Sequence, residues 1–150
     1  MYVWDTRSGA ELFHTRDYEW PGPRFTPDGT TLLAALWNLR AYATGTWQPA
    51  DPPLPDALAA MIPHTLVPRS LAFSPDGTLV VMGIIDRVRI ARWPTWEPLL
   101  ELNCMPDPRI AGLAFSPDNR HLLIVGNLGR VELVDLALLR EQLARLGLDW

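Results

Sequence analysis

The chain has 150 residues, of which 48% are hydrophobic and 20% are charged, a balance that excludes a disordered tail and fits one globular domain. Its net charge of −4 argues against broad affinity for nucleic acid, whose phosphates attract basic surfaces. All 13 basic residues are arginine, which excludes a phosphate-binding loop lysine, a Schiff-base lysine and the strand lysine of protein kinases.

The sequence lacks the signals of membrane insertion and export. It has no run of 18 apolar residues that could span a bilayer, and its opening residues lack the basic and apolar regions of a secretory signal. The single cysteine, Cys104, cannot form an internal disulfide, which fits a reducing compartment but also suits a secreted chain that needs no bridge. We therefore expect a cytoplasmic protein with no membrane partner.

Three copies of one short motif divide the sequence. FTPDGTTL begins at Phe25, FSPDGTLV at Phe73 and FSPDNRHL at Phe115, at separations of 48 and 42 residues. A fixed period of this length is typical of propeller blades. In each copy we expect the Phe to end an inner strand, the Pro to stop its ladder and the Asp-Gly or Asp-Asn pair to form a hairpin turn. The repeated aspartates are therefore predicted to be structural turn residues: Asp28, Asp76 and Asp118.

Each predicted hairpin is followed by further strands in chain order. Apolar runs with the length of a strand buried on both faces predict middle strands at residues 32–37, 79–85 and 122–125. Third strands are predicted at residues 39–43, 88–91 and 131–134, and the last two alternate apolar and polar residues as half-buried strands do. A fourth, outer strand is predicted at residues 98–102. The predicted blades span residues 22–67, 68–103 and 108–136.

A proline-rich insertion separates the first two motifs. Six prolines fall between residues 48 and 68, and because proline has no backbone N–H they make a regular outer strand difficult before about Ala57. The insertion is either a loose connection between blades or an exposed partner-binding loop with polyproline character.

A short helix is predicted over residues 136–147. Asp135 can cap its first turn, Gly147 can stop it, and Glu141 and Arg145 are spaced for an i,i+4 ion pair. Four leucines fall on one helix face: Leu136, Leu139, Leu143 and Leu146. Such a stripe is usually part of a core, so we expect the helix to dock on the last blade, with a free partner helix as the alternative.

The segment SLAFSPDGTLVVMGIIDRVRIA resembles one blade of a WD-repeat (Trp-Asp repeat) β-propeller in order, length and turn chemistry. Val3-Trp4-Asp5 is similar to the stretch that ends a third strand in that family, with residues 11–14 as the outer strand of a partial blade over residues 1–16. The resemblance implies an all-β fold of about three four-stranded blades, as an open or partial propeller with a short C-terminal helix, in a single domain.

Two further residues match structural positions of the WD-repeat family. His64 takes the place of the family's Gly-His histidine, and Asp86 lies in the turn that holds its structural aspartate. The resemblance implies a hydrogen bond between these two side chains. The family network also uses a Ser or Thr and a Trp, and here those positions resemble Met82 or Ile84 and Ala91, so at most half of the network is present.

The ending LVDLALLREQLARLGLDW is similar to the C-termini of bacterial WD-repeat proteins, including large kinases of planctomycete type. This resemblance implies that the chain is the carboxyl end of such an array, without its kinase part. Three blades and a partial one are fewer than the four to eight that close a ring. Because an open arc exposes strand edges, we expect them to pair with a protein partner or with a second copy of the chain.

Two groups of side chains in the second predicted blade are candidate partner-binding residues. Arg87, Arg89 and Arg92 alternate or nearly alternate with apolar residues, so they are expected on one strand face, which is either solvated or a patch for an acidic partner. Trp93 and Trp96 mark the turn before the outer strand. They are expected to be half-exposed, either as interface anchors or as covers of the blade edge.

No catalytic constellation is recognisable in the sequence. The three histidines have no Cys or His companion at metal-ligand spacing, and no serine lies in a Gly-x-Ser-x-Gly elbow. We therefore predict no metal, no cofactor and no enzymatic activity. The preferred hypothesis is a protein-interaction or scaffold module. The alternatives are a propeller whose channel binds a small ligand, as a sensor or an enzyme, and a truncated remnant of a larger protein such as a WD-repeat kinase.

Overall fold

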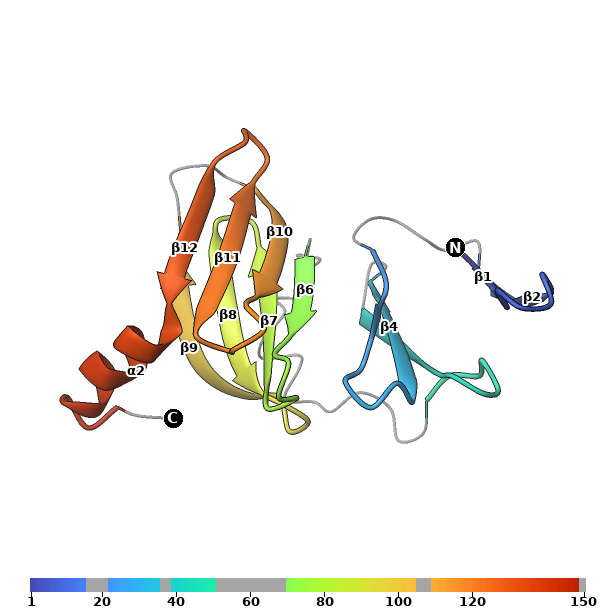
Figure 1. Cartoon of the computed structure of the whole chain (residues 1–150), viewed down its shortest axis with the longest axis horizontal. Helices are drawn as coiled ribbons and strands as arrows, with labels where there is room; N and C mark the ends of the chain where they lie inside the picture. Colours follow the sequence, from blue (N-terminus) through green and yellow to red (C-terminus); the bar gives the residue numbers. More distant parts are fainter. Residues whose placement is uncertain (16–21, 36–38, 51–69, 105–108, 149–150) are drawn as a thin grey trace.

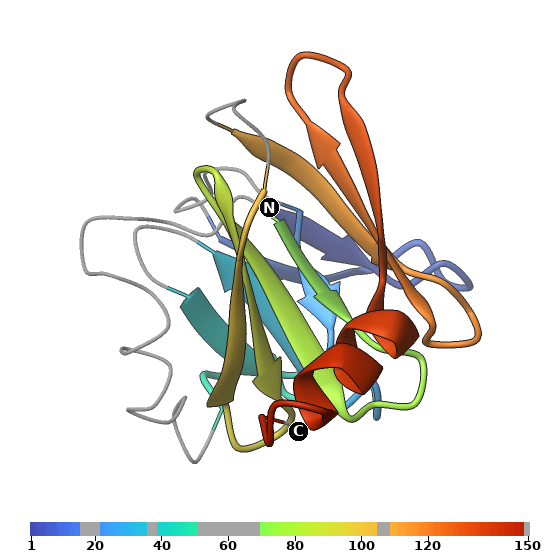
Figure 2. The ribbon, with the colours of Figure 1, turned by 90° about the vertical axis from the view of Figure 1, so that its left-hand side faces the viewer.

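The computed structural model describes residues 1–15, 22–35, 39–50, 70–104 and 109–148. Within these residues the chain forms four antiparallel sheets and one helix. The sheets follow one another from the N-terminal to the C-terminal end of the molecule (Figure 1), and Figure 2 views the molecule from the end that carries the helix. The all-β fold predicted from the repeated hairpins is confirmed.

Every sheet is built from strands that are consecutive in the sequence. The leading sheet pairs β1 (Tyr2–Trp4) with β2 (Glu11–His14), and the first blade is β3 (Arg24–Phe25), β4 (Thr31–Ala35) and β5 (Leu39–Ala43). The second blade has four strands: β6 (Ser70–Phe73), β7 (Leu79–Ile84), β8 (Arg87–Arg92) and β9 (Glu97–Asn103). The third blade has three, followed by the helix: β10 (Ile110–Phe115), β11 (His121–Gly126), β12 (Val131–Asp135) and α2 (Leu136–Ala144).

The predicted strand positions agree closely with the observed ones. β2 and β5 have the predicted bounds, and β8 and β9 extend the prediction by one residue at each end. Most of the proline-rich insertion, with His64, lies outside the described residues. The role of that insertion and the hydrogen bond between His64 and Asp86 therefore stay predictions.

The repeated motif builds the same turn three times. In the second blade the Ser74 hydroxyl donates to Asp76 Oδ1 at 2.6 Å and accepts from the Leu79 amide at 2.8 Å. The same Oδ1 accepts from the Thr78 amide at 3.0 Å. The side chains of Ser74 and Asp76 thus accept hydrogen bonds from two backbone amides of the turn. The other two copies repeat these bonds with Thr26 and Asp28, and with Ser116 and Asp118.

The residue after each turn aspartate has a left-handed backbone. The φ angles are 70° at Gly29, 69° at Gly77 and 60° at Asn119. Glycine adopts this region without a Cβ clash, and asparagine tolerates it better than most residues. This conformational demand explains why the motif ends in Asp-Gly twice and in Asp-Asn once.

A cluster of buried apolar side chains lies between each pair of consecutive sheets. Tyr42 of the first blade shares one with the leading sheet, and Leu33 of the first blade shares another with Met82 of the second. Ile90 of the second blade and Ile124 of the third belong to the largest cluster. The middle strand of the second blade, β7, is therefore buried on both faces, as its apolar run predicts.

Gly83 marks the closest approach between the second and third blades. A Cβ atom at this position would lie 2.7 Å from Ile110 Cγ2 and 3.1 Å from Ile110 Cβ. Since a core at normal packing density cannot absorb such an overlap without moving backbone, only glycine fits here.

Helix α2 is capped at both ends as its sequence predicts. The Asp135 carboxylate accepts from the Leu138 amide at 2.9 Å. At the other end the Gly147 amide donates to the Ala144 carbonyl and the Leu148 amide to the Leu143 carbonyl, with Gly147 at φ 72°.

The docking of α2 on the third blade is confirmed only for its beginning. Leu136 is buried in the cluster between the second and third blades, and Leu139 packs against that cluster. Leu146, which was expected on the docked face, is 72% exposed, so this part of the prediction is wrong. The helix leaves the sheet at an angle (Figure 1), and its last turn therefore has no strand beneath it.

Candidate interaction surfaces

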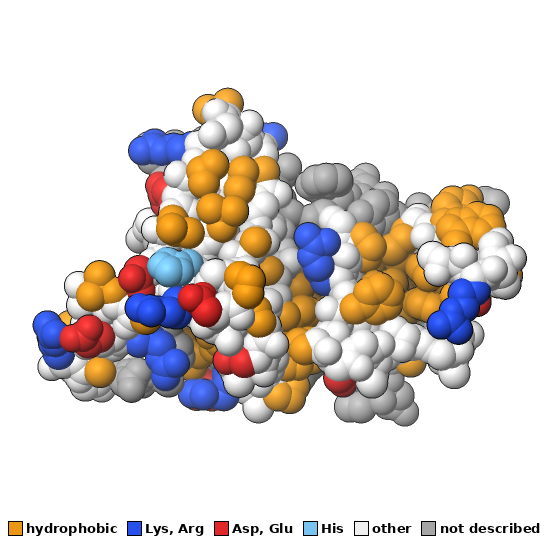
Figure 3. All heavy atoms as spheres, in the orientation of Figure 1, with side chains coloured by type: hydrophobic (Ala, Val, Ile, Leu, Met, Phe, Trp, Pro, Cys, Tyr) orange, Lys and Arg blue, Asp and Glu red, His pale blue; other side chains and the backbone are white. Residues whose placement is uncertain are grey.

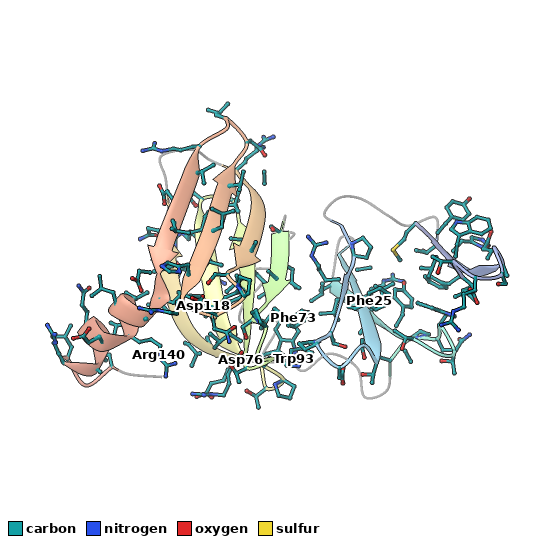
Figure 4. The ribbon with its side chains drawn as sticks, in the orientation of Figure 1. Phe25, Phe73, Asp76, Trp93, Asp118 and Arg140 are labelled. Atoms are coloured by element: carbon teal, nitrogen blue, oxygen red, sulfur yellow. The ribbon has the colours of Figure 1, made fainter. Side chains whose placement is uncertain are left out.

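The turn aspartates Asp28, Asp76 and Asp118 are held by hydrogen bonds within their own turns. The hydroxyl two residues earlier lowers the pKa of Asp28 and that of Asp118. Burial acts in the opposite direction on Asp76, but the hydrogen bonds of its turn outweigh it and leave the pKa lowered. Figure 4 shows Asp76 and Asp118 at the same end of their two blades. This placement fits the structural role predicted for them.

Asp86 lies between β7 and β8, at the position of the structural aspartate that the resemblance implies. Its side chain is about half-exposed, and its Oδ1 lies 3.9 Å from Arg87 Nε. Its backbone carbonyl accepts from the Cys104 amide at 3.1 Å, which fixes the end of β9 beside the turn.

The three candidate arginines are paired with carboxylates of the neighbouring strand. Arg87 Nη1 and Arg89 Nε lie 2.5 and 2.6 Å from the two carboxylate oxygens of Glu101, and hydrogen bonds from Arg89 in particular lower the pKa of that carboxyl. Arg92 Nε lies 3.0 Å from Glu97 Oε2. The row of arginines is therefore balanced by acidic residues on β9, and binding an acidic partner would require exchange of these pairs. Its use by a partner stays a prediction.

The expectation that Trp96 is half-exposed is wrong. Trp96 is 1% exposed, and it packs among the apolar residues between the first and second blades. It occupies a left-handed position, φ 60°, in the turn between β8 and β9, and this backbone turns its ring into the interface. A partner could reach Trp96 only if that interface opened.

Trp93 is half-buried, as predicted, and it belongs to an aromatic group. Its ring packs edge-on against Phe73 at 4.9 Å and against Trp96 at 5.4 Å between centroids. Figure 4 shows Trp93 and Phe73 together at the side of the second blade nearer the first blade. These contacts favour the interpretation of Trp93 as a cover of the blade edge.

The outer edge of the third blade has no strand beside it among the described residues. The Leu136 amide donates to the Arg120 carbonyl, on the inner side of this edge, at 2.8 Å. Because the backbone groups of a strand point alternately to its two sides, those of Val131, Leu133 and Asp135 point away from β11. In the second blade the corresponding strand, β8, is paired on this side with β9.

Apolar side chains are exposed on the outer face of the third blade, which we call the C-terminal face. Val131 is 58% and Leu133 65% exposed, and they lie opposite Val125 and Leu123 of β11. Figure 3 shows hydrophobic side chains gathered over β11 and β12. The alternation in this strand predicted that its apolar residues would face the core. Instead these two face outward, and the side chain half-buried between them is Glu132.

Aromatic side chains are exposed at the opposite end of the molecule, on what we call the N-terminal face. Trp4 and Tyr2 of β1 are more than half-exposed, and Leu12 of β2 is exposed beside them. The Tyr2 ring stacks on Trp4 at 6.3 Å and on His14 at 5.7 Å between centroids. Sequence reasoning missed both faces, although the repeat itself contains the signal: a blade face that packs on a neighbour is apolar wherever it occurs.

The described residues contain no group of three or more His, Cys, Asp and Glu side chains placed to hold a metal ion. Burial raises the pKa of the Cys104 thiol to about 11, so its nucleophilic thiolate form is scarce at neutral pH. None of the described helical residues forms a segment long and apolar enough to cross a bilayer.

The fold is similar to that of solved WD40 propellers. The β-propeller domain of Cps50 (Swd1) from Myceliophteria thermophila matches with a TM-score of 0.68 and 16% identity, over 89% of this chain and 44% of its own. The WD40 repeats of RRP9 match with a TM-score of 0.64 and 18% identity, over 84% and 38%. No family model and no curated protein matches the sequence. The chain has the fold of part of a WD40 β-propeller and spans less than half the length of these two.

Proposed function

We propose that this chain is a non-catalytic interaction module, a scaffold that binds a protein partner by accepting an extended segment along β12. The observation that carries the proposal is the open edge of that strand, where the backbone groups of Val131, Leu133 and Asp135 have no partner strand among the described residues. An edge of this kind is a ready site for strand addition, because main-chain hydrogen bonds supply affinity and alternate side chains supply selectivity.

The second blade indicates which segment suits this edge. There the position is filled by β9, whose sequence is EPLLELN, and Leu100 and Leu102 of that strand pack against the cluster beneath. We therefore propose that the partner supplies an extended segment with apolar residues at alternate positions. A residue at the place of Glu101 would lie between Arg130 and Glu132, which stand where Arg87 and Arg89 stand in the second blade, so selectivity would come from the apolar positions.

A labelled peptide with the sequence of β9, EPLLELN, tests the proposal by fluorescence anisotropy. We expect it to bind the 150-residue chain. Leu133→Pro removes one outward N–H without touching the bonds to β11, and we expect it to weaken binding about fivefold, since one net hydrogen bond contributes about 1 kcal/mol. Leu133→Thr keeps the N–H and is the matched control. Failure of the chain to bind, or equal binding by the proline variant, would contradict strand addition.

We also propose that the chain represents the C-terminal part of a bacterial WD-repeat protein and functions in the cytoplasm. The first proposal is supported by the likeness of residues 133–150 to the endings of such proteins, and the second by a buried cysteine without a disulfide. Sequencing the neighbouring coding region tests the first, because it predicts further blades in an upstream frame. An unrelated upstream gene would count against it.

A further inference from the structure

Each sheet has two faces, and the three apolar clusters of the described residues cover all but two of them. The clusters join the leading sheet to the first blade, the first blade to the second and the second blade to the third. This leaves the far side of the leading sheet and the far side of the third blade. These are the N-terminal and C-terminal faces defined above, and both are apolar.

The second blade provides an internal reference for the C-terminal face. Val88 and Ile90 of β8 lie opposite Gly83 and Val81 of β7, just as the exposed pair on β12 lies opposite two residues of β11. Both Val88 and Ile90 are completely buried, because the third blade packs on them. Val131 and Leu133 therefore occupy positions that a following blade covers wherever one is present.

The turns provide the corresponding reference for the N-terminal face. The Gly9 amide bonds to the Asp5 carbonyl as the Trp47 amide bonds to Ala43 and the Trp96 amide to Arg92, each at 2.8 Å. Three residues directly precede this turn and therefore occupy equivalent positions in their sheets: Trp4, Tyr42 and Ala91. The last two are buried against the preceding sheet, whereas Trp4 is 54% exposed.

Two exposed faces of this composition are unusual for the ends of a repeat array. A repeat protein that ends in water carries terminal repeats with polar outer faces. Here one end presents stacked aromatic rings and the other presents Val131 and Leu133 beside Leu123 and Val125. Among the described residues of β11 and β12, His121 lies opposite Asp135 at one margin of the C-terminal face. Both ends therefore have the character of interface halves.

We infer that the N-terminal face of one copy of this chain packs on the C-terminal face of a second copy. The contact would repeat, between chains, the order in which each sheet packs on the next within the chain. Head-to-tail contacts form a closed ring only if the rotation per chain is right, and otherwise form filaments. The chain matches 44% and 38% of the two solved propellers, so two copies supply most of one ring. For the 150-residue chain by itself the geometry points to a closed dimer, whereas in a longer protein the upstream blades proposed above would take the place of the second copy.

This inference is independent of strand addition. It concerns the faces of the end sheets, whereas strand addition concerns the backbone edge of β12. Leu133→Glu changes the face while keeping the edge N–H, so it separates the two proposals.

Multi-angle light scattering on the eluting 150-residue chain tests the inference. We expect a mass about twice 16.9 kDa. Leu133→Glu on one face and Trp4→Glu on the other are each expected to give a monomer, because either charge is buried without a partner at both contacts. Leu138→Glu is the matched control, since Leu138 is 50% exposed but lies on α2, and it should leave the dimer intact. Circular dichroism of each variant monitors folding.

Mixing the two face variants makes the test specific for head-to-tail contact. Each variant retains one intact face, and a mixture can form one of the two contacts. We therefore expect mixed dimers that neither variant forms alone. A monomeric wild-type chain would overturn the inference and would assign the faces to another chain or to further blades of a longer one. Disruption by Leu133→Glu with no effect of Trp4→Glu would also overturn it, in favour of a symmetric contact.

Discussion

The second and third blades are built on the same motif and differ in what surrounds them. Their turns carry the same hydrogen bonds, and their third strands, β8 and β12, place apolar residues at equivalent positions. The second blade has a fourth strand on its edge and a neighbour on each face. The third has neither a fourth strand nor a neighbour on its far face among the described residues. Whether an apolar side chain of a blade is buried therefore depends on the presence of a neighbouring sheet. The blade's own sequence supplies only the apolar residues at the positions that such a neighbour would cover.

The largest expected effect comes from truncating one residue at the equivalent position in each blade. Ile90→Ala should lower the free energy of unfolding by about 2–5 kcal/mol, because it leaves a cavity under the third blade. Leu133→Ala should change it by less than about 0.5 kcal/mol in the monomer, because the side chain is already in water. Urea denaturation at a concentration where the chain is monomeric compares them. Similar losses in both variants would show that the C-terminal face is not open.

A smaller effect is expected where the two blades touch. Gly83→Ala should lower the free energy of unfolding by about 1–3 kcal/mol, since the added Cβ meets Ile110. Gly112→Ala is the control, because its Cβ would lie 3.7 Å from Val125, an ordinary contact on the far side of the third blade. Thermal unfolding should rank the first variant well below the second. Equal melting temperatures would contradict the close packing of these blades.

The smallest expected effect is one that the two blades share. The folded-state pKa of Asp76 and that of Asp118 are both lowered, so their contribution to stability is present at neutral pH and is lost as the pH falls below about 4. Asp76→Asn and Asp118→Asn should each make the unfolding free energy less sensitive to pH between about 6 and 3. A wild-type chain that gained stability on acidification would show that these carboxylates are not held as described.

Local signals explain why the turns and strands could be predicted. The Phe-Ser-Pro-Asp motif specifies its turn through bonds between residues at most five apart, so the sequence is sufficient. The burial of Trp96 was not predictable in this way, because its direction depends on a left-handed backbone and on the first blade. The exposure of Leu146 was not predictable either. This residue continues the apolar stripe of the helix, but the helix extends beyond the sheet on which the stripe was expected to pack. The two apolar faces at the ends follow from blade packing, which no single segment encodes.

Amide hydrogen exchange at Ile90 and Leu133, followed by NMR, tests the open edge of the third blade most directly. Ile90 and Leu133 occupy equivalent positions. The backbone N–H and C=O groups of each point to the outer edge of the strand, where β9 lies in the second blade. We predict strong protection for the Ile90 amide and rapid exchange for the Leu133 amide in the free chain, with protection of Leu133 appearing when the EPLLELN peptide is added. Equal protection of both amides in the free chain would mean that the edge is already covered, and would contradict this account.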